Sequence, residues 1–462
     1  MTRLRTLRLL VVAAVVLLLP MQRLHAQSSA NFLSMYREDV ARLVRAATSS
    51  DFAWRRLAEL TDVNGPRLSG SDNLTRAIAW SVEKMKADGL ENVHTEKVMV
   101  PHWVRGQESA EIVDPPVSDV AMLGLGGTVA TRPEGVVAEV LPVNNFDDLQ
   151  THAADAKGRI VLFNVPYTNY SETVTYRTTS ARAAAQFGAV GVLVRSVGPT
   201  GLRTAHTGSV TYAPGLPEIP AASISAEDAN RIVRLTARGH YVRMRLVTGG
   251  HYEPDAESAN VVAEIRGREK PDEIVLIGGH LDSWDVGTGA ADDGVGCIVT
   301  WEALRLMKHL GLRPRRTVRL VLFTNEENGL RGANAYADRY GEMAGNHVFA
   351  LESDSGVLAP ATFGFSGSTA ARLMMAQIGA LLASVGVPEI GPGGGGADIG
   401  PIVQLGNVPA MAYLGDATRY FVSHHTPADT VERVPPDDVS RAAASIAAVT
   451  YVVAEMPERL PR

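Results

Sequence analysis

Cysteine is almost absent from this chain, because Cys297 is the only one among 462 residues. A single cysteine cannot form a disulfide within the chain, so a fold held together by internal disulfides is excluded. Cys297 stands at the start of a predicted helix that follows a polar loop. We expect it to be packed in the core and not to act as a nucleophile.

Clustered positive charge is also missing beyond the first 26 residues. The net charge is −6, and the remainder is more acidic once the four arginines of residues 1–26 are set aside. An acidic chain without a basic run argues against nucleic acid as a partner. The glycine-rich stretch 391–396 does not end in the Gly-Lys-Ser/Thr of a phosphate-binding loop. The sequence contains no internal repeat.

The apolar run near the N-terminus is too short to span a membrane comfortably. Residues 9–19 are apolar, Arg3, Arg5 and Arg8 precede them, and Leu24-His25-Ala26 forms an acceptable cleavage site. Residues 1–26 are therefore predicted to be a secretory signal peptide. We expect a secreted or periplasmic protein with no stable membrane anchor after cleavage, and an uncleaved anchor is the alternative.

Strands and helices alternate in the sequence after Pro254. Strands are predicted at 260–265, 273–277, 317–323, 348–351 and 409–413. Helices are predicted at 295–310, 331–340, 369–385 and 437–455. Alternation of this kind predicts an α/β fold with a mostly parallel central sheet and helices on both faces.

The earlier part of the chain divides into two regions. Helices are predicted at 31–48, 51–61 and about 73–89, with a strand at 93–100. A region rich in Val, Gly and Pro follows, with short strands and one helix near 176–188, which predicts a β-rich module inserted into the larger domain. The predicted organisation is a signal peptide at 1–26, the N-terminal part of the larger domain at 27–109, the insertion at 110–252, and the remainder of the larger domain at 253–462.

Acidic and histidine side chains gather just beyond the predicted strands. These are His280, Asp282, Asp285, Asp292, Asp293, Glu326, Glu327, Asp354 and a later His424-His425 pair. Because carboxyl ends of neighbouring strands meet at one edge of a sheet, we expect most of these side chains to converge there. A site with two histidines and several carboxylates suits divalent ions, zinc first. It holds too many carboxylates for one tetrahedral zinc, so two metals bridged by a carboxylate and a water are predicted.

Each motif alone has an ordinary structural explanation. A His-x-Asp loop commonly forms a local hydrogen bond, and paired Asp residues commonly begin a helix, where acids favour the positive end of the dipole. Their joint occurrence, in order and at strand ends, favours the metal site.

Six motifs carry a resemblance to a known family. They are Gly-Gly-His-Leu-Asp-Ser-Trp-Asp-Val-Gly at 278–287, Asp-Asp-Gly-Val-Gly at 292–296, Glu-Glu-Asn-Gly at 326–329, Glu-Ser-Asp-Ser-Gly at 352–356, Gly-Ala-Asp-Ile-Gly-Pro at 396–401, and His-His-Thr-Pro-Ala-Asp-Thr at 424–430. With these motifs the chain resembles the M28 co-catalytic zinc exopeptidases, and within them the plasma glutamate carboxypeptidase (carboxypeptidase Q) branch. The stretch 183–193 makes the insertion similar to a protease-associated domain.

The resemblance implies two zinc ions per chain and a role for each motif. His280 and Asp354 would bind one ion, Glu327 and His425 the other, and Asp292 would bridge both. Glu326 would be the general base, and Asp282 would orient the His280 ring. His424 and Asp398 would contact substrate. Bare chemistry leaves the choice between Glu326 and Glu327 open. Asp293 is expected to serve the following helix N-terminus, Asp429 to be a local cap or a partner behind a ligand, and Asp285 has no predicted role.

The resemblance also implies an activity. We expect a zinc metallo-exopeptidase that hydrolyses short peptides, dipeptides with free termini in the first place, by a metal-bridged hydroxide. A general aminopeptidase of the same family is the alternative, and a glutaminyl cyclase-like acyl transferase or a non-catalytic receptor is disfavoured because no ligand position is missing. The family is expected to form homodimers. The inserted module would cover the active-site cleft, or else serve only as a packing module.

Overall fold

Two eight-stranded sheets organise the chain in the computed structural model, which describes residues 34–116 and 118–462. The predicted signal peptide at residues 1–26 lies outside the described residues. The central sheet has the strand order β1-β10-β12-β11-β13-β16-β14-β15. Its strands are β1 (Glu91–Val104), β10 (His251–Ile265), β12 (Arg316–Phe323), β11 (Lys270–His280), β13 (His347–Glu352), β16 (Ala410–Leu414), β14 (Thr362–Ser366) and β15 (Ile390–Pro392).

The middle of this sheet is parallel and its sides are not. Strands β12, β11, β13 and β16 run parallel, whereas β1 with β10, β10 with β12, and β14 with β16 are antiparallel. The parallel strands are apolar on both faces: residues 275–277 of β11 and 349–351 of β13 are fully buried. The prediction of a mostly parallel sheet therefore holds for the centre, and antiparallel strands extend it on either side.

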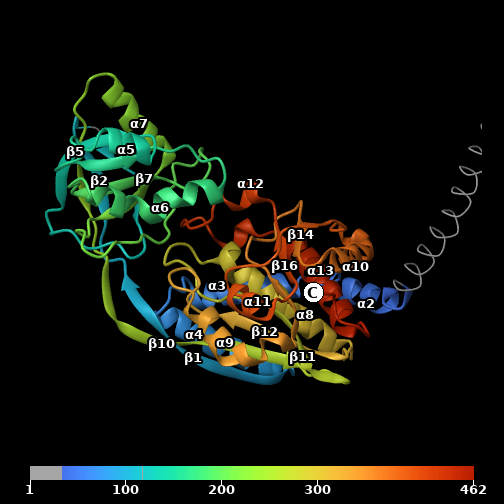
Figure 1. The fold of residues 1–462 in the computed structure, drawn as a ribbon. Helices are drawn as coiled ribbons and strands as arrows, with labels where there is room; N and C mark the ends of the chain where they lie inside the picture. The colour runs from blue at the N-terminus through green and yellow to red at the C-terminus, as the bar shows by residue number, and fades with distance from the viewer. Residues whose placement is uncertain (1–33, 117) are drawn as a thin grey trace, which may run out of the picture.

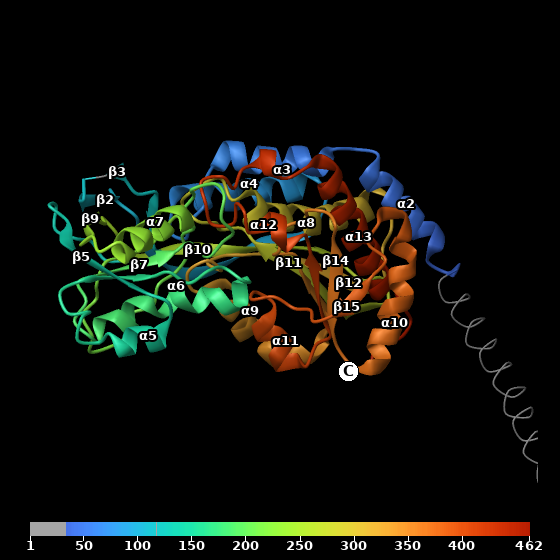
Figure 2. The ribbon, with the colours of Figure 1, turned by 90° about the horizontal axis from the view of Figure 1, so that it is seen from above.

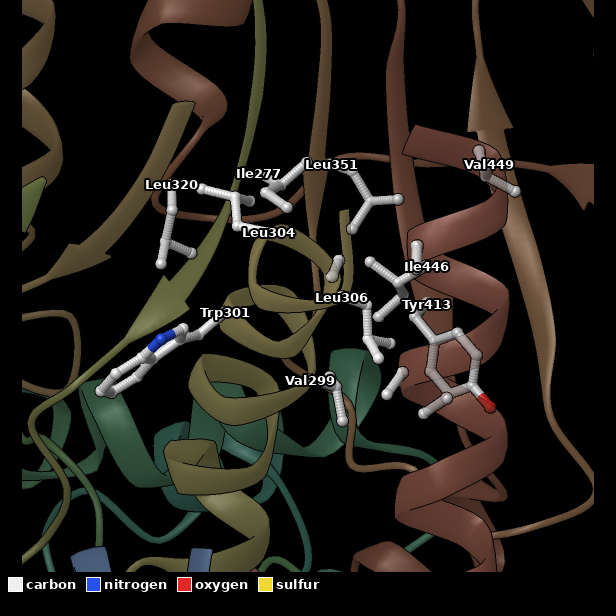
Figure 3. Close-up of a cluster of buried hydrophobic side chains, with 14 of the residues drawn as sticks. Ile277, Val299, Trp301, Leu304, Leu306, Leu320, Leu351, Tyr413, Ile446 and Val449 are labelled. Atoms are coloured by element: carbon white, nitrogen blue, oxygen red, sulfur yellow. The ribbon is translucent and has the colours of Figure 1, made fainter. Parts of the chain in front are cut away.

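Helices cover both faces of the central sheet (Figure 2). One face packs against α2 (Arg37–Thr48), α3 (Phe52–Asn64), α4 (Asp72–Ala87), α8 (Val295–His309), α10 (Thr369–Gly379) and α13 (Pro436–Glu455). The other packs against α9 (Arg331–Tyr340) and α11 (Gly400–Gly406). Figure 3 shows why most of α8 is apolar, since it lies between sheet residues such as Ile277 and α13 residues such as Ile446. None of the helices in the described part of the chain combines the length and apolarity needed to cross a membrane.

A second sheet forms a separate lobe (Figure 1, upper left). Its strands in sheet order are β3 (Ser118–Asp119), β2 (Ser109–Asp114), β9 (Arg243–Val247), β5 (Val136–Val143), β6 (Ile160–Phe163), β7 (Gly191–Arg195), β8 (Ala221–Ile224) and β4 (Met122–Gly124). The prediction of one helix here was wrong, because α5 (Phe146–Thr151), α6 (Tyr170–Ala185) and α7 (Ala226–Ala237) are all present. Each face of this sheet has its own hydrophobic cluster. We call this lobe the inserted domain.

The long strands β1 and β10 join the two lobes (Figure 1). They pair antiparallel from Glu91 opposite Glu264 to Val104 opposite His251. The chain therefore enters and leaves the inserted domain along one two-stranded ribbon.

Most of the other predicted elements match the structure with small shifts at their ends, but the strand predicted at 260–265 is the much longer β10, which begins at His251. The predicted helices at 295–310, 331–340 and 437–455 correspond to α8, α9 and α13. The predicted helix at 369–385 is α10 followed by a 3-10 turn, Ala380–Val385. Helix α11 and strands β14 and β15 were not predicted, because each is short and flanked by glycines.

His347 makes the stability of the central domain depend on pH. Its side chain is buried at the start of β13 and its Nε2 atom lies 2.8 Å from the Tyr336 hydroxyl. Burial, and then the charge of Arg319, lower the pKa of His347 to about 4. The unfolded chain takes up this proton near pH 6.5 while the folded chain does not, so the free energy of unfolding decreases as pH falls from about 6.5 to 4.

We expect His347→Gln to remove about 2 kcal/mol of the decrease in unfolding free energy between pH 7 and pH 5. Glutamine keeps an acceptor for the Tyr336 hydroxyl but does not titrate. Denaturant midpoints measured at both pH values provide the test, with His309→Gln on the exposed end of α8 as the control. Equal pH slopes for His347→Gln and the wild type would contradict the assignment.

Candidate metal centre

The end of β11 and four loops bring most of the predicted site residues to the carboxyl edge of the central sheet. His280 is the last residue of β11, Glu326 and Glu327 follow β12, and Asp354 follows β13. Asp292 lies in an irregular turn, Ala290–Gly294, between β11 and α8, and its peptide bond to the next residue is cis. The His424-His425 pair follows the short helix α12 (Ala417–Tyr420).

Asp292 lies at the centre of these side chains. Its Oδ1 atom is 3.4 Å from His280 Nε2, and its Oδ2 atom is 3.0 Å from His425 Nε2. His280 Nε2 is also 3.6 Å from Asp354 Oδ1, and His425 Nε2 is 3.1 Å from Glu327 Oε2. Two groups of possible ligand atoms therefore share Asp292, one with His280 and Asp354, and the other with the histidine pair.

Both histidines of the pair face Asp292. Their rings stack with centroids 3.6 Å apart, and His424 Nε2 is 3.4 Å from Asp292 Oδ2. His425 contacts the Glu327 carboxylate as well, whereas the ion pair recorded for His424 is with Asp292. Burial, followed by the neighbouring His425, lowers the pKa of His424 well below its usual value. The geometry thus favours His425 over His424 as the residue that completes a site with Glu327.

The two adjacent glutamates differ in their surroundings. The Glu327 side chain is 3% exposed and points to His425. The Glu326 side chain is 21% exposed, and its Oε2 atom is 4.0 Å from His280 Nε2. Burial raises the pKa of Glu326 well above its usual value; Asp354 and Glu327 raise it further, while His280 opposes them. A glutamate with a raised pKa at the open side of a cluster can exchange a proton with a bound molecule.

The acid cluster fits a cation. Burial, and then the charge of Asp292, raise the pKa of Glu327 to about 7. Burial also raises the pKa of Asp354, and the charge of Asp292 adds to this effect. Asp292 Oδ2 and Glu327 Oε1 are buried and accept no hydrogen bond. Imidazole nitrogens and carboxylate oxygens are ligands that zinc takes. The residues present therefore fit zinc at two adjoining positions.

Asp282 forms hydrogen bonds that position both His280 and the two glutamates. The His280 Nδ1–H group donates to the main-chain carbonyl of Asp282 at 2.9 Å. The Asp282 carboxylate lies 3.9 Å from Nδ1 and instead accepts from the main-chain N–H groups of Glu326 at 3.1 Å and Glu327 at 3.3 Å. Asp282 thus orients the ring through its carbonyl and positions both glutamates through its carboxylate.

Asp293 and Asp429 position the loop around Asp292. Asp293 accepts from the N–H of Gly296 at the start of α8, as expected, and also from that of His280. Asp429 accepts from the N–H groups of Ala291 at 2.7 Å and Asp292 at 3.1 Å. Asp429 is therefore a partner behind a predicted ligand, which was one of the two roles expected for it.

Two arginines important to this loop were missed in the sequence. The fully buried Arg67 donates to the carbonyls of Leu281, Thr288 and Gly289, so it holds the loop that leads to Asp292. Arg105 pairs with Asp285 at 2.5 Å and thereby gives that carboxylate a role. In the sequence, Arg67 lies in the motif Gly-Pro-Arg-Leu-Ser-Gly at 65–70. A single arginine in a loop is not typical of any one function, so this motif did not identify its role.

Asp398 lies in the interior next to Glu352. Neither carboxylate oxygen of Asp398 accepts a hydrogen bond, and its side chain is buried. Burial, and then Glu352, raise the pKa of Asp398 well above its usual value. Glu352 accepts from the N–H of Ile399 at 2.8 Å. The predicted contact of Asp398 with substrate stays a prediction.

Comparisons with known proteins identify the family. Peptidase family M28 matches residues 260–450, and the PA domain matches residues 129–232. Carboxypeptidase Q of Bos taurus is 47% identical over 410 residues, which are 89% of this chain and 87% of that protein. The Homo sapiens protein of the same name is 46% identical over the same shares.

Solved structures show the same fold. The crystal structure of a peptidase M28 precursor from Shewanella amazonensis superimposes with a TM-score of 0.89 at 34% identity, covering 93% of this chain and 99% of that one. BSAP, a zinc aminopeptidase from Bacillus subtilis, has a TM-score of 0.66 at 19% identity, covering 88% and 96%. The second likeness is evidence for the fold alone.

Proposed function

Because the chain belongs to peptidase family M28 and is a zinc metallopeptidase, we propose that it is a di-zinc exopeptidase that hydrolyses short peptides, and dipeptides with free termini in particular. The observation that carries the two-metal proposal is the central position of Asp292, which faces His280 on one side and His425 on the other.

We assign ligands according to these contacts. His280 and Asp354 hold one ion, Glu327 and His425 hold the other, and Asp292 is shared. When bound, the zinc ions act as Lewis acids toward the substrate carbonyl and lower the pKa of water.

The protein supplies the proton transfer. Glu326 accepts a proton from the water that attacks the peptide carbon and delivers it to the nitrogen of the leaving amine. Its raised pKa and its partly open position suit both steps. Asp282 holds the main chain of Glu326 in place throughout. His424, beside the predicted ligands, and Asp398 are the proposed substrate-binding residues.

The inserted domain lies over this edge of the sheet, and we propose that it limits the size of the substrate. The Ser209 hydroxyl donates to the main-chain carbonyl of Glu327 at 3.0 Å, and the ring of Tyr170 lies 5.2 Å from that of His424. We also propose that the inserted domain begins at the boundary 109/110 and ends at 252/253, and that residues 1–26 are an export signal. The protein would then be secreted or periplasmic and would form a homodimer.

We expect the chain to hydrolyse Ala-Ala at least about tenfold faster than N-acetyl-Ala-Ala or an alanyl anilide, because a site built for two free termini loses contacts when either is blocked. Rates of amine release measured for the three compounds at equal enzyme concentration check this. Strong turnover of the anilide without turnover of Ala-Ala would identify a general aminopeptidase instead. One zinc per chain, with acyl transfer, would favour the cyclase alternative.

A further inference from the structure

The inserted domain pairs directly with His425 through the main chain of Thr207. The Thr207 N–H donates to the His425 carbonyl at 2.9 Å. The Thr207 carbonyl lies 3.2 Å from His425 Nδ1. A carbonyl can only accept, so this contact favours the tautomer with the proton on Nδ1 and leaves Nε2 to face Asp292 and Glu327. The Arg177 guanidinium, which can only donate, also lies near Nδ1 but does not form a hydrogen bond with it in that tautomer.

This pairing holds a residue that is otherwise in an unfavourable conformation. His425 has φ +60°, in the left-handed region that residues with a Cβ rarely occupy. Such a conformation is costly and persists where the surroundings determine it. One hydrogen bond with Thr207 holds the His425 main chain, and the other holds its ring. Together they fix both the backbone conformation and the direction of the imidazole.

Arg177 on α6 braces the segment that makes these contacts. Its Nη1 atom donates to the Thr207 carbonyl at 3.0 Å and lies 3.2 Å from His425 Nδ1. Its Nη2 atom donates to the Tyr170 hydroxyl at 2.6 Å. Gly208 has φ +133°, and a Cβ added there would meet the guanidinium at 2.2 Å. The buried Arg177 therefore fits closely against the segment 207–209.

The contacts of the inserted domain fall on one half of the cluster. Thr207 contacts His425, and Ser209 donates to the carbonyl of Glu327. In the part of the chain that the structure describes, the recorded hydrogen bonds and ion pairs of His280 and Asp354 lie within the central-sheet domain. The two proposed metal positions thus differ in their dependence on the inserted domain.

We infer that Arg177 and the segment 207–209 of the inserted domain are positioning elements for the metal held by Glu327 and His425, so that the affinity of this one position depends on docking of the inserted domain. The inference rests on the proposed two-metal site. Linkage is reciprocal, so metal at this position also stabilises the docked arrangement.

The inference is tested by measuring the zinc affinity of Arg177→Ala, a measurement that does not depend on catalytic turnover. Competition with a chromophoric chelator is expected to show two zinc ions per wild-type chain, with one of them bound about 10- to 100-fold more weakly in Arg177→Ala, the size of effect that loss of a group behind a ligand has. The other ion should bind within about twofold of wild type. Arg182→Ala, on the exposed side of the same helix, is the matched control and should bind both ions normally.

A double-mutant cycle locates the effect. In a Glu327→Gln background, Arg177→Ala should have little further effect on zinc binding, because the position it supports is already lost. Zinc should also slow amide hydrogen exchange at Thr207 in the wild type but not in Glu327→Gln. If Arg177→Ala does not fold, Ser209→Ala carries the same test, with weakening expected at the same position.

The outcomes separate the two proposals. A wild type that binds only one zinc would overturn the two-metal site. A wild type with two zinc ions, together with folded Arg177→Ala that binds both normally, would overturn only the inference about the inserted domain, even if its melting temperature decreased. Equal weakening at both positions would also count against it, since the contacts reach only one.

Discussion

Glu326→Gln is expected to lower kcat for Ala-Ala about 1,000-fold and to leave the zinc content unchanged, because general acid–base catalysis contributes about 10²- to 10⁴-fold. Glutamine has nearly the same shape but cannot accept the proton of the attacking water. The Glu326 side chain is not among the proposed ligands, and its main-chain N–H still donates to Asp282 in the variant. The measurement is kcat and KM, with zinc quantified in the same samples.

The neighbouring glutamate provides the control for this experiment. Glu327→Gln should lose zinc from one position as well as activity, because Glu327 contacts His425 in the buried part of the cluster. If Glu326→Gln lost zinc and Glu327→Gln kept it, the roles of the two residues would have to be exchanged. If Glu326→Gln kept full activity, Glu326 would not be the base.

Asp292→Asn is expected to abolish turnover and to weaken zinc at both positions by more than about 100-fold, which exceeds the loss expected from a group behind a ligand. Asp292 is the residue common to both groups of ligand atoms. Asp354→Asn is the matched comparison, because Asp354 contacts His280 and should affect only one position. Zinc titration of the two variants checks the difference.

The metal-free proteins distinguish this explanation from unfolding. Without zinc, burial raises the pKa of Asp292, but His424, His280 and His425 outweigh it and hold this pKa well below its usual value, so the charged carboxylate stabilises the folded chain. Metal-free Asp292→Asn should therefore melt somewhat lower than metal-free wild type but remain folded, whereas zinc should raise the melting temperature of the wild type only. A variant that melted far lower without metal would show that Asp292 is needed for folding, and its inactivity would then carry no information on metal binding.

The sequence predicted the ends of the central strands well, and through them the candidate site. The apolar run 274–277 favoured a strand buried on both faces, which placed His280 at the sheet edge. The same argument placed Glu326, Glu327 and Asp354. Their roles as ligands or base are proposals that came from the family motifs, because spacing alone does not distinguish one glutamate from the next.

Residues that act through main-chain contacts were not predictable in this way. Arg67 binds three carbonyls of a loop more than 200 positions away, and Thr207 acts on His425 through its own N–H and carbonyl. Any residue type has these main-chain groups, so no sequence pattern marks them. The inserted domain also contained more helix than expected. Helix α5 has only six residues, whereas α7 carries a helical signal that was missed, a Ser225 cap followed by buried Ala229 and Ile232 on one face.

The ribbon formed by β1 and β10 sets an order for folding. Its two strands are neighbours in the sheet, yet residues 105–250 separate them in the chain. Closing so long a loop is entropically costly while its interior is unfolded, and the cost falls once that interior is compact with its ends close together. The inserted domain has two hydrophobic clusters of its own. We therefore expect the inserted domain to fold first. Strand β1 would remain unpaired during synthesis until β10 has been made and can pair with it.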